Sequence, residues 1–241
     1  MNTTVIVLGT ILLLVILYMI FQDYFTGKTK LTDEKSLNKE LPTIPGDDLS
    51  QANSTLVTYS IWLYVNSWNT DKFKPIILRD GDVNLWLDKN TATLKLNVGG
   101  TWDVNTPIEV DQNASATNKK DSVYDITNNF PLQKWTCILV SVDNKIIDVY
   151  LDGKLVKSIE NTTTINSDAS KAISIGGGQG NQWDGIIARF ERQPKVTDPA
   201  SAYDKYAEGA GSGSLSKALG NFNINLSILK DNVETSRFAL F

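Results

Sequence analysis

Short segments in which apolar and polar residues alternate fill much of the chain after residue 56. The first segment, 56–66, repeats its apolar residues at every second position, which is the period of a strand with one buried face. The residues that share this face are Val57, Tyr59, Ile61, Leu63 and Val65. The same alternation returns in segments 83–88 and 92–98. The sequence therefore predicts a succession of short β-strands.

A tight hairpin is indicated at Asp152-Gly153, which separates the strand-like segments 145–151 and 154–160. Asp-Gly is favoured in type I′ turns, whose twist matches that of paired strands. Further strands are expected, by apolar patterning and turn signals, at 135–142, 172–175, 185–192, 222–229 and 233–240. Lys230-Asp231-Asn232 is a turn-forming group that joins the last two of these segments.

One short helix is expected after residue 198. Asp198 is a good N-cap, Pro199 suits the first helical position, and Gly209 is a typical helix end. Many closely spaced strands with a single short helix are typical of a β-sandwich or jelly roll and not of a βαβ fold. The predicted fold class is therefore all-β.

An apolar run from Val5 to Phe21 contains no charged residue. As a helix it would span about 26 Å at ~1.5 Å per residue, which just crosses a bilayer. The residues before it, MNTT, lack the basic charge of a signal peptide, and no small-residue cleavage site follows. We therefore expect one N-terminal transmembrane helix. Because Lys28 and Lys30 follow the run, the positive-inside rule places the larger part of the chain on the cytoplasmic side.

These signals divide the chain into four parts. Residues 1–27 form the predicted anchor and its membrane interface. Residues 28–55 are polar, carry Pro42 and Pro45, and are interpreted as a stalk or extended arm, either a passive spacer or a segment lying along a neighbour. Residues 56–209 form the predicted sandwich. Residues 210–241 combine a Gly/Ser linker with a C-terminal β-hairpin that we expect to pack on the sandwich.

Composition excludes several classes of function. A net charge of −4 leaves no basic surplus for neutralising phosphates, so nucleic acid is not an expected partner. The chain has no histidine, the residue most used for proton transfer near neutral pH and for zinc ligation. The single cysteine, Cys137, lies in an apolar run and is interpreted as a small buried hydrophobe. The absence of disulfides favours a reducing compartment.

The remaining candidate motifs carry little chemistry. Gly176-Gly177-Gly178 lacks the Lys-Ser/Thr of a phosphate loop and is interpreted as a strand-to-strand loop. The paired acids Asp80 with Asp82 and Asp148 with Asp152 are residue types that serve in glycoside hydrolysis or in calcium binding. A turn and a solvated strand face are the default interpretations of these pairs. No catalytic residue and no cofactor are therefore predicted, with a calcium ion as the one alternative left open.

Tryptophan is frequent, with six copies in the chain. Trp62 and Trp135 lie inside strand-like segments and are interpreted as structural. The candidates for contact with a ligand or a protein are Trp68, Trp86, Trp102 and Trp183, which lie nearer loops or opposite the core pattern. Aromatic rings stack on apolar sugar faces, and Trp is also a common anchor in protein interfaces. Both a glycan platform and a protein contact are consistent with these positions, and we favour the protein contact.

Several segments resemble the laminin-G-like, concanavalin A-like lectin/glucanase superfamily across residues 56–209. They are YSIWLYV at 59–65, IILRDGDVNLWLD at 76–88, the hairpin region 131–158, and ISIGGG followed by WDGIIARF at 183–190. The resemblance implies a concanavalin A-like sandwich. Glucanases of this superfamily carry a Glu-x-Asp-x-Glu strand motif, which this chain lacks, so the resemblance does not imply hydrolysis.

The order of anchor, polar arm and lectin-like domain is also similar to membrane-linked virion proteins of large double-stranded DNA viruses, including those of algae. That resemblance implies a non-catalytic minor capsid protein that tethers the shell to the internal membrane, with lipid and capsid proteins as partners and its domain on the cytoplasm-equivalent side. The rival hypothesis is a membrane-anchored adhesion module that binds glycans. A diverged glucanase that uses aspartates alone is the third hypothesis.

Overall fold

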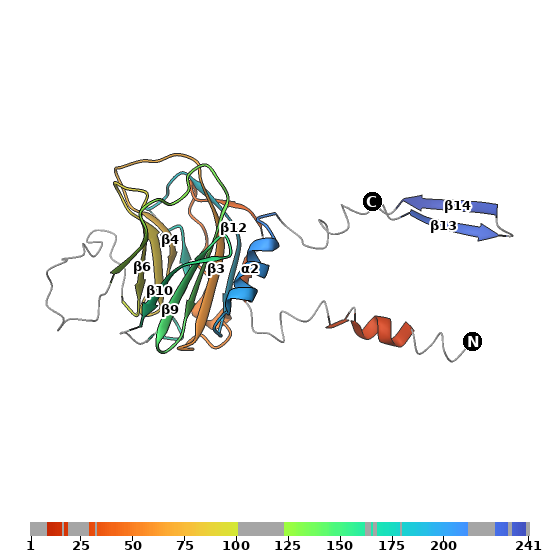
Figure 1. Cartoon of the computed structure of the whole chain (residues 1–241), viewed down its shortest axis with the longest axis horizontal. Helices are drawn as coiled ribbons and strands as arrows, with labels where there is room; N and C mark the ends of the chain where they lie inside the picture. The colour runs from red at the N-terminus through yellow and green to blue at the C-terminus, as the bar shows by residue number, and fades with distance from the viewer. Residues whose placement is uncertain are drawn as a thin grey trace, which may run out of the picture.

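The computed structural model describes residues 9–15, 17–18, 29–31, 33–100, 123–161, 165, 168–178, 180–211, 225–230 and 233–239. Two antiparallel sheets pack face to face, with one helix beside the larger sheet (Figure 1). The larger sheet has seven strands. In spatial order they are β1 (Thr29–Leu31), β12 (Gly185–Gln193), β3 (Val57–Val65), β8 (Thr136–Val142), β9 (Ile146–Leu151) and β10 (Lys154–Glu160), with β2 (Lys35–Ser36) also paired to β12.

The smaller sheet has five strands. Its order is β11 (Ser174–Ile175), β4 (Lys74–Leu78), β5 (Val83–Leu87), β6 (Leu94–Val98) and β7 (Val123–Thr127). The remaining elements are the 3-10 turn η1 (Gly46–Asp48), the helix α2 (Pro199–Ala207) and the hairpin of β13 (Asn225–Lys230) with β14 (Val233–Ala239). The predicted all-β sandwich is confirmed.

The core lies between the two sheets and follows the predicted alternation. On β3, Tyr59, Ile61 and Leu63 are buried in the main apolar cluster, and Ile61 pairs with Ile138 of β8. Leu85 of β5 and Leu96 of β6 are paired in the facing sheet and join the same cluster. Burial of such apolar surface is the main favourable term in folding, at roughly 25 cal/mol per Å².

The hairpin between β9 and β10 has the predicted turn. Asp152 and Gly153 both have positive φ angles, 49° and 74°, as a type I′ turn requires. A Cβ atom at Gly153 would lie 3.1 Å from Tyr203 of α2, so glycine also allows the helix to approach this turn. The pairing from Lys154 opposite Leu151 to Glu160 opposite Ile146 confirms this hairpin.

The described residues of the predicted stalk or arm lie along the sandwich. β1 and β2 both pair with β12 and cover that edge of the larger sheet. Leu37 and Leu49 are buried in the main core, and Ile44 forms a bridge with Ile173. A few apolar residues spaced along a polar segment are enough to fix it to a sheet edge, which local composition does not reveal. The sandwich therefore begins near Thr29 and not at residue 56.

A buried charge cluster holds the end of this arm. The hydroxyl of Tyr59 and the guanidinium of Arg79 donate to the same carboxylate oxygen of Asp82, at 2.8 Å and 2.6 Å. Arg79 also donates to the carbonyl of Ala52, and Arg192 donates to the carbonyl of Ser50. All four side chains are essentially inaccessible to solvent. Asp82 alone cannot accept all the hydrogen bonds that two buried arginines can donate. The backbone carbonyls of the arm accept some of the others, which ties the arm to the core.

The predicted helix is also confirmed. The Asp198 carboxylate accepts hydrogen bonds from the backbone amides of Ala200 and Ser201, Pro199 occupies the first turn, and Gly209 has a φ of 72°. Figure 1 shows α2 on the side of the larger sheet that faces away from the smaller sheet. The helix therefore covers part of the outer face of the larger sheet.

Two predicted elements, the anchor and the C-terminal hairpin, are described only in part. Residues 9–15 and 17–18 are helical. Among the residues that the structure describes, no helix is both long enough and apolar enough to cross a membrane. The anchor stays a prediction, as does the packing of the β13–β14 hairpin on the sandwich.

Candidate functional site

Four side chains of β3 form a row on the outer face of the larger sheet, the face turned away from the smaller sheet. Thr58, Ser60, Trp62 and Tyr64 alternate with the core residues, so all four face away from the smaller sheet. The helix covers the middle of this row. Tyr206 stacks on Trp62 with ring centroids 5.8 Å apart. A second contact places Ala202 against Leu139 and Tyr150. Two small apolar clusters therefore seat α2 on the sheet.

A β-bulge in β12 directs the side chain of Arg189 toward the C-terminal end of α2. The pairing of β12 with β3 shifts register between Ala188 and Glu191, and Arg189 has a φ of 51°, a left-handed conformation that costs a non-glycine residue energy. Its guanidinium donates to the carbonyls of Glu208 and Gly209 at 3.0 Å and 2.9 Å. These carbonyls lie at the C-terminal end of α2, where the last carbonyl groups lack partners within the helix and a cation is favourable. The bulge therefore places a charge that caps α2.

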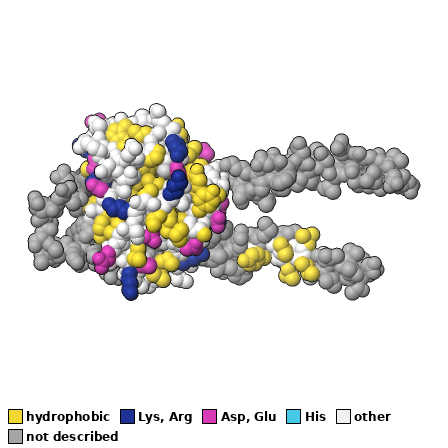
Figure 2. Space-filling model, in the orientation of Figure 1, with side chains coloured by type: hydrophobic (Ala, Val, Ile, Leu, Met, Phe, Trp, Pro, Cys, Tyr) yellow, Lys and Arg dark blue, Asp and Glu magenta, His cyan; other side chains and the backbone are white. Residues whose placement is uncertain are grey.

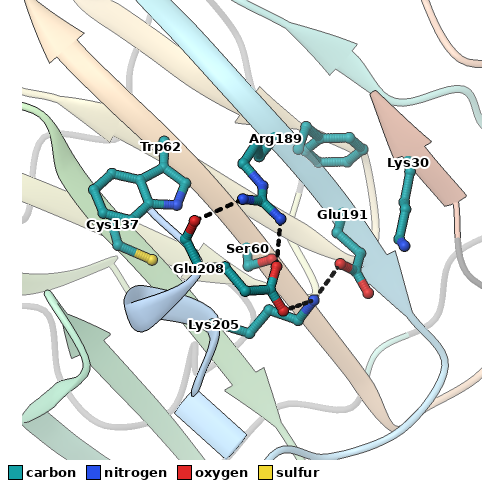
Figure 3. A pocket seen from close by; sticks show the side chains of 9 residues that line it. Lys30, Ser60, Trp62, Cys137, Arg189, Glu191, Lys205 and Glu208 are labelled. Atoms are coloured by element: carbon teal, nitrogen blue, oxygen red, sulfur yellow. Dashed lines mark hydrogen bonds and ion pairs between the residues drawn. The ribbon is translucent and has the colours of Figure 1, made fainter. Parts of the chain in front are cut away.

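Lys205 connects two carboxylates in the same region. Its ammonium lies 2.7 Å from Glu191 of β12 and 3.4 Å from Glu208. Burial opposes the charge of Lys205, but the hydrogen bond and charge of Glu191, followed by those of Glu208, outweigh it and raise the pKa of the ammonium. Figure 3 shows Arg189, Glu208, Lys205 and Glu191 as one continuous chain of charges, with Trp62 and Cys137 to one side.

A small cavity opens beside these charges. Its volume is about 50 Å³, enough for one or two water molecules, and its lining includes Lys30, Ser60 and Glu191 (Figure 3). A larger groove of about 240 Å³ continues along the same face and shares Ser60, Lys205 and Glu208 with the cavity. Thr197, Asp198 and Ser201, from the helix and the residues before it, line the other wall.

The floor of this groove is polar and buried. The polar outer-face residues with less than a tenth of their surface exposed are Thr58, Ser60, Ser141, Glu191 and Gln193. Thr58, Ser60 and Gln193 line the groove, Glu191 lines the adjoining small cavity, and Ser141 pairs with Thr58 beside them. The amide of Gln193 donates to Glu191, and the backbone amide of Thr197 donates to the Ser141 hydroxyl. A helix that packs on a sheet for stability alone buries apolar side chains. This strip instead offers fixed donors and acceptors, which suit a ligand rich in hydroxyl groups.

Charges of both signs alternate over the visible face of the sandwich, without a large area of either sign (Figure 2). The described residues contain no group of three or more acidic or cysteine side chains arranged to hold a metal ion. Asp82 is fixed by Arg79, whereas Asp148 accepts a hydrogen bond from Ser158 and Asp152 bonds to Lys134. The sequence-predicted acid pairs therefore have structural partners.

The four tryptophans that the sequence offers as contacts for a ligand or a protein differ in their exposure. Trp86 and Trp183 are only 1% and 4% exposed. β5 is buried on both of its faces, and the Trp183 indole donates to the carbonyl of Pro75 inside the domain. Trp68 is partly buried, with the Lys74 ammonium 3.9 Å from its ring centroid, and its role as a contact stays a prediction. Trp102 lies outside the described residues.

Cys137 is buried beneath α2, as the sequence predicted. It packs with Trp62 and Ala188, and burial, followed by the charge of Asp152, raises the pKa of its thiol to about 12. A thiol that stays protonated at neutral pH is a poor nucleophile and a poor metal ligand. Cys137 therefore belongs to the seat of the helix and supplies no chemistry to the groove.

The residues of the groove were not predicted from the sequence. Glu191 and Gln193 fall at the end of a strand-like segment, and only the bulge at Arg189 determines which of them face outward. The caps of α2 predict the helix but not the surface on which it lies. One available signal was the pair of opposite charges Lys205 and Glu208 at i and i+3, at the end of the predicted helix.

Comparison with known proteins adds a family and a fold. The family described as the concanavalin A-like lectin/glucanases superfamily matches residues 42–196. No curated protein matches the sequence. Similar solved structures include the ligand-binding domain of botulinum neurotoxin serotype D, determined with N-acetylneuraminic acid, at 12% identity and a TM-score of 0.52. The match covers 76% of this chain and 45% of the neurotoxin chain, so this chain spans less than half of that length.

Two further structures are similar at a lower level. Domain 4 of an extracellular arabinanase from Geobacillus stearothermophilus, determined with arabinotriose, has 16% identity and a TM-score of 0.47, over 73% of this chain and 86% of that chain. The binding domain of a paraclostridial mosquitocidal protein has 10% identity and a TM-score of 0.47, over 74% and 47%. At such identities the likeness concerns the fold alone.

Proposed function

The chain belongs to the concanavalin A-like lectin/glucanases superfamily, and from this premise we propose that it is a non-catalytic carbohydrate-recognition protein whose sugar site is the groove beside α2. One observation carries the proposal: a strip of polar side chains is buried on the outer face of the larger sheet, where it forms the floor of that groove. Fixed polar groups in a partly desolvated site give directional hydrogen bonds to hydroxyl groups.

The size of the groove limits the ligand. Its volume of about 240 Å³ lies below the roughly 300–1,000 Å³ of sites that take drug-sized molecules. A single sugar unit, or the end of a longer glycan, matches this volume better than an internal stretch of polysaccharide. Gln193 would orient the hydroxyls from the sheet, Glu191 would do so from the adjoining cavity, and Lys205 from the helix.

The carboxylates of the groove support binding and not hydrolysis. Glycoside hydrolases need one carboxylic acid that is protonated at the working pH and a second that is ionised. Here Glu191 pairs with Lys205, and Glu208 pairs with both Arg189 and Lys205. Both carboxylates are therefore already engaged as charge and hydrogen-bond partners of cations in the protein itself.

Glycan-array binding of the full chain in detergent, followed by calorimetry on the best ligand, tests the proposal. N-acetylneuraminic acid and arabinotriose belong among the probes. Glu191→Gln should weaken binding roughly tenfold or more, because a hydrogen bond to a charged group is worth about 1.5–3 kcal/mol. Asp148→Asn changes an outer-face carboxylate that lines neither the groove nor the adjoining cavity and is the matched control. A blank array, or equal affinities for Glu191→Gln and the wild type, would contradict the proposal.

A second candidate function is a tether between a bilayer and a virion capsid shell, favoured by the N-terminal helix. The large side chains described in this helix, at positions 11–15, 17 and 18, are 40–65% exposed, which water does not favour. β1 begins at Thr29, eight residues after the apolar run ends at Phe21, so an anchored domain would be held close to the membrane surface. Lipid and capsid proteins would then be its partners, on the cytoplasm-equivalent side.

Cross-linking of intact virus particles tests this second candidate. Cross-links from the sandwich to capsid proteins, together with alkaline-resistant membrane association that is lost when residues 5–21 are deleted, are the expected results. Recovery of the chain only from host membranes would count against the capsid role. Unchanged membrane association after the deletion would count against the anchor.

A further inference from the structure

A second surface on the outer face of the larger sheet combines aromatic and polar groups. Tyr64 and Trp135 are both partly exposed, and their ring centroids lie 5.6 Å apart at an interplanar angle of 60°. The pairing of Leu63 with Thr136 sets these two residues opposite each other on adjacent strands. On the other side of Tyr64, its partner Ile186 of β12 is also partly exposed. The three side chains form an apolar row across three strands.

A fixed carboxylate lies at the edge of this row. Asp184 precedes β12, and its carboxylate accepts hydrogen bonds from Asn38 at 3.1 Å, Asn66 at 2.9 Å and Ser67 at 2.6 Å. The Ser67 hydroxyl and the Asn66 amide hold the pKa of Asp184 below its usual range. Asp184 lies two residues from Ile186, and Asn66 lies two residues from Tyr64, so strand alternation puts the polar group beside the apolar row.

We propose that Tyr64 and Trp135 form a stacking surface for the apolar face of a neutral hexopyranose, with Asp184 and Asn66 as partners for its hydroxyls. This subsite rests on the proposed function and adds a second place where a glycan binds. A pyranose presents C–H groups on its faces and hydroxyls on its rim. The apolar row can contact the C–H face of the pyranose, and the preorganised carboxylate at its edge can accept hydrogen bonds from the hydroxyls of the rim. The ionised Asp184 selects against acidic sugars by charge repulsion.

The subsite is separate from the groove. Tyr64 lies four residues beyond Ser60 on β3, which corresponds to roughly 14 Å at ~3.4 Å per residue. Tyr206 of α2 covers the intervening Trp62. A structural role alone would explain burial of the ring, as at Trp62, which is 7% exposed. A structural role does not explain why the rings of Tyr64 and Trp135 are partly exposed to solvent next to the hydrogen-bonded carboxylate of Asp184.

Titration of the full chain in detergent with cellotriose tests the subsite, read by saturation-transfer NMR and by tryptophan fluorescence. β-Linked glucose units carry only equatorial substituents, so both ring faces are apolar. Tyr64→Leu should weaken cellotriose binding about tenfold, the upper range for an aromatic contact, whereas Tyr64→Phe should retain it. Asp184→Asn should reduce affinity for cellotriose and also admit glucuronic acid, which the wild type excludes. Tyr203→Leu, at an exposed tyrosine on α2, is the matched control.

The variants separate this inference from the proposed function. If Glu191→Gln abolishes glycan binding while Tyr64→Leu and Asp184→Asn leave cellotriose affinity unchanged, the groove stands and the subsite is wrong. If Tyr64→Leu alone reduces cellotriose affinity, the subsite stands without the groove. Absence of any cellotriose signal from the wild type, or a Tyr64→Phe variant as weak as Tyr64→Leu with unchanged thermal stability, overturns the stacking role.

Discussion

The ammonium of Lys205 lies 2.7 Å from a carboxylate oxygen of Glu191, and this ion pair joins α2 to the outer face of the larger sheet. Glu191 is 5% exposed, so its charge has little access to water as an alternative partner. The pair therefore contributes both to the seating of the helix and to the charge pattern of the proposed sugar site.

Replacing Lys205 with Met should loosen α2. The variant keeps the length of the side chain but leaves the buried Glu191 carboxylate without its cation, which costs about 1–3 kcal/mol. Urea unfolding should show this loss, and limited proteolysis should cut faster near residues 199–211. Lys154→Met, at an exposed lysine of β10, is the control and should change stability by less than about 0.5 kcal/mol. Equal stability of the two variants would contradict the structural role of the pair.

Asp82→Asn should be among the most destabilising single changes. It removes the only carboxylate that contacts Arg79 and Tyr59 within the described core, and breaking a buried ion pair costs about 3–5 kcal/mol. Equilibrium unfolding in urea measures the effect. Asp80→Asn changes a more exposed neighbour in the same turn and should cost far less. A loss below about 1 kcal/mol for Asp82→Asn would mean that the cluster does not hold the arm.

Cys137 should make the protein less stable as pH rises above 9. Its pKa is about 9 in the unfolded chain and about 12 in the folded protein, so between these values the folded state binds more protons. The unfolding free energy then falls with increasing pH by up to about 1.4 kcal/mol per pH unit. Cys137→Ala should show a shallower decline over pH 9–11. Identical pH profiles for wild type and variant would contradict the buried, protonated thiol.

Deprotonation of Lys74 in mildly alkaline solution should change the fluorescence of Trp68. Burial lowers the pKa of this lysine to about 8, against the opposing charge of Asp88, and its ammonium lies over the Trp68 ring. Tryptophan fluorescence should therefore change with a midpoint near pH 8, and Lys74→Met should abolish that transition. Because the folded-state pKa is lowered, wild-type stability should rise relative to Lys74→Met between pH 8 and 10.5. A wild-type signal that is flat from pH 7 to 9 would contradict this contact.

Local patterns predicted most of the sandwich because strands with one buried face show their period directly, as β3 does at Val57–Val65. They failed where both faces are buried. On β5, Trp86 alternates with core residues as an exposed side chain would, yet it is covered as fully as Leu85. Local patterns also missed β4, whose Pro75 is atypical of an internal strand.

The site could not be predicted from local sequence patterns because its residues come from distant parts of the chain. Arg189, Glu191 and Lys205 come together only through a bulge in β12 and the docking of α2. Tyr64 and Trp135, 71 positions apart, become neighbours through the register of β3 with β8. Two of the tryptophans to which residue types pointed, Trp86 and Trp183, are buried, whereas Trp135, interpreted as structural, is partly exposed.

The central claim is that the outer face of the larger sheet binds carbohydrate, and hydrogen–deuterium exchange of the full chain with and without its best array glycan tests it most directly. The account predicts slower exchange in residues 58–64, 185–193 and 199–209, with no change in 74–98 of the smaller sheet. Protection confined to the smaller sheet, or none anywhere at saturating glycan, would contradict it.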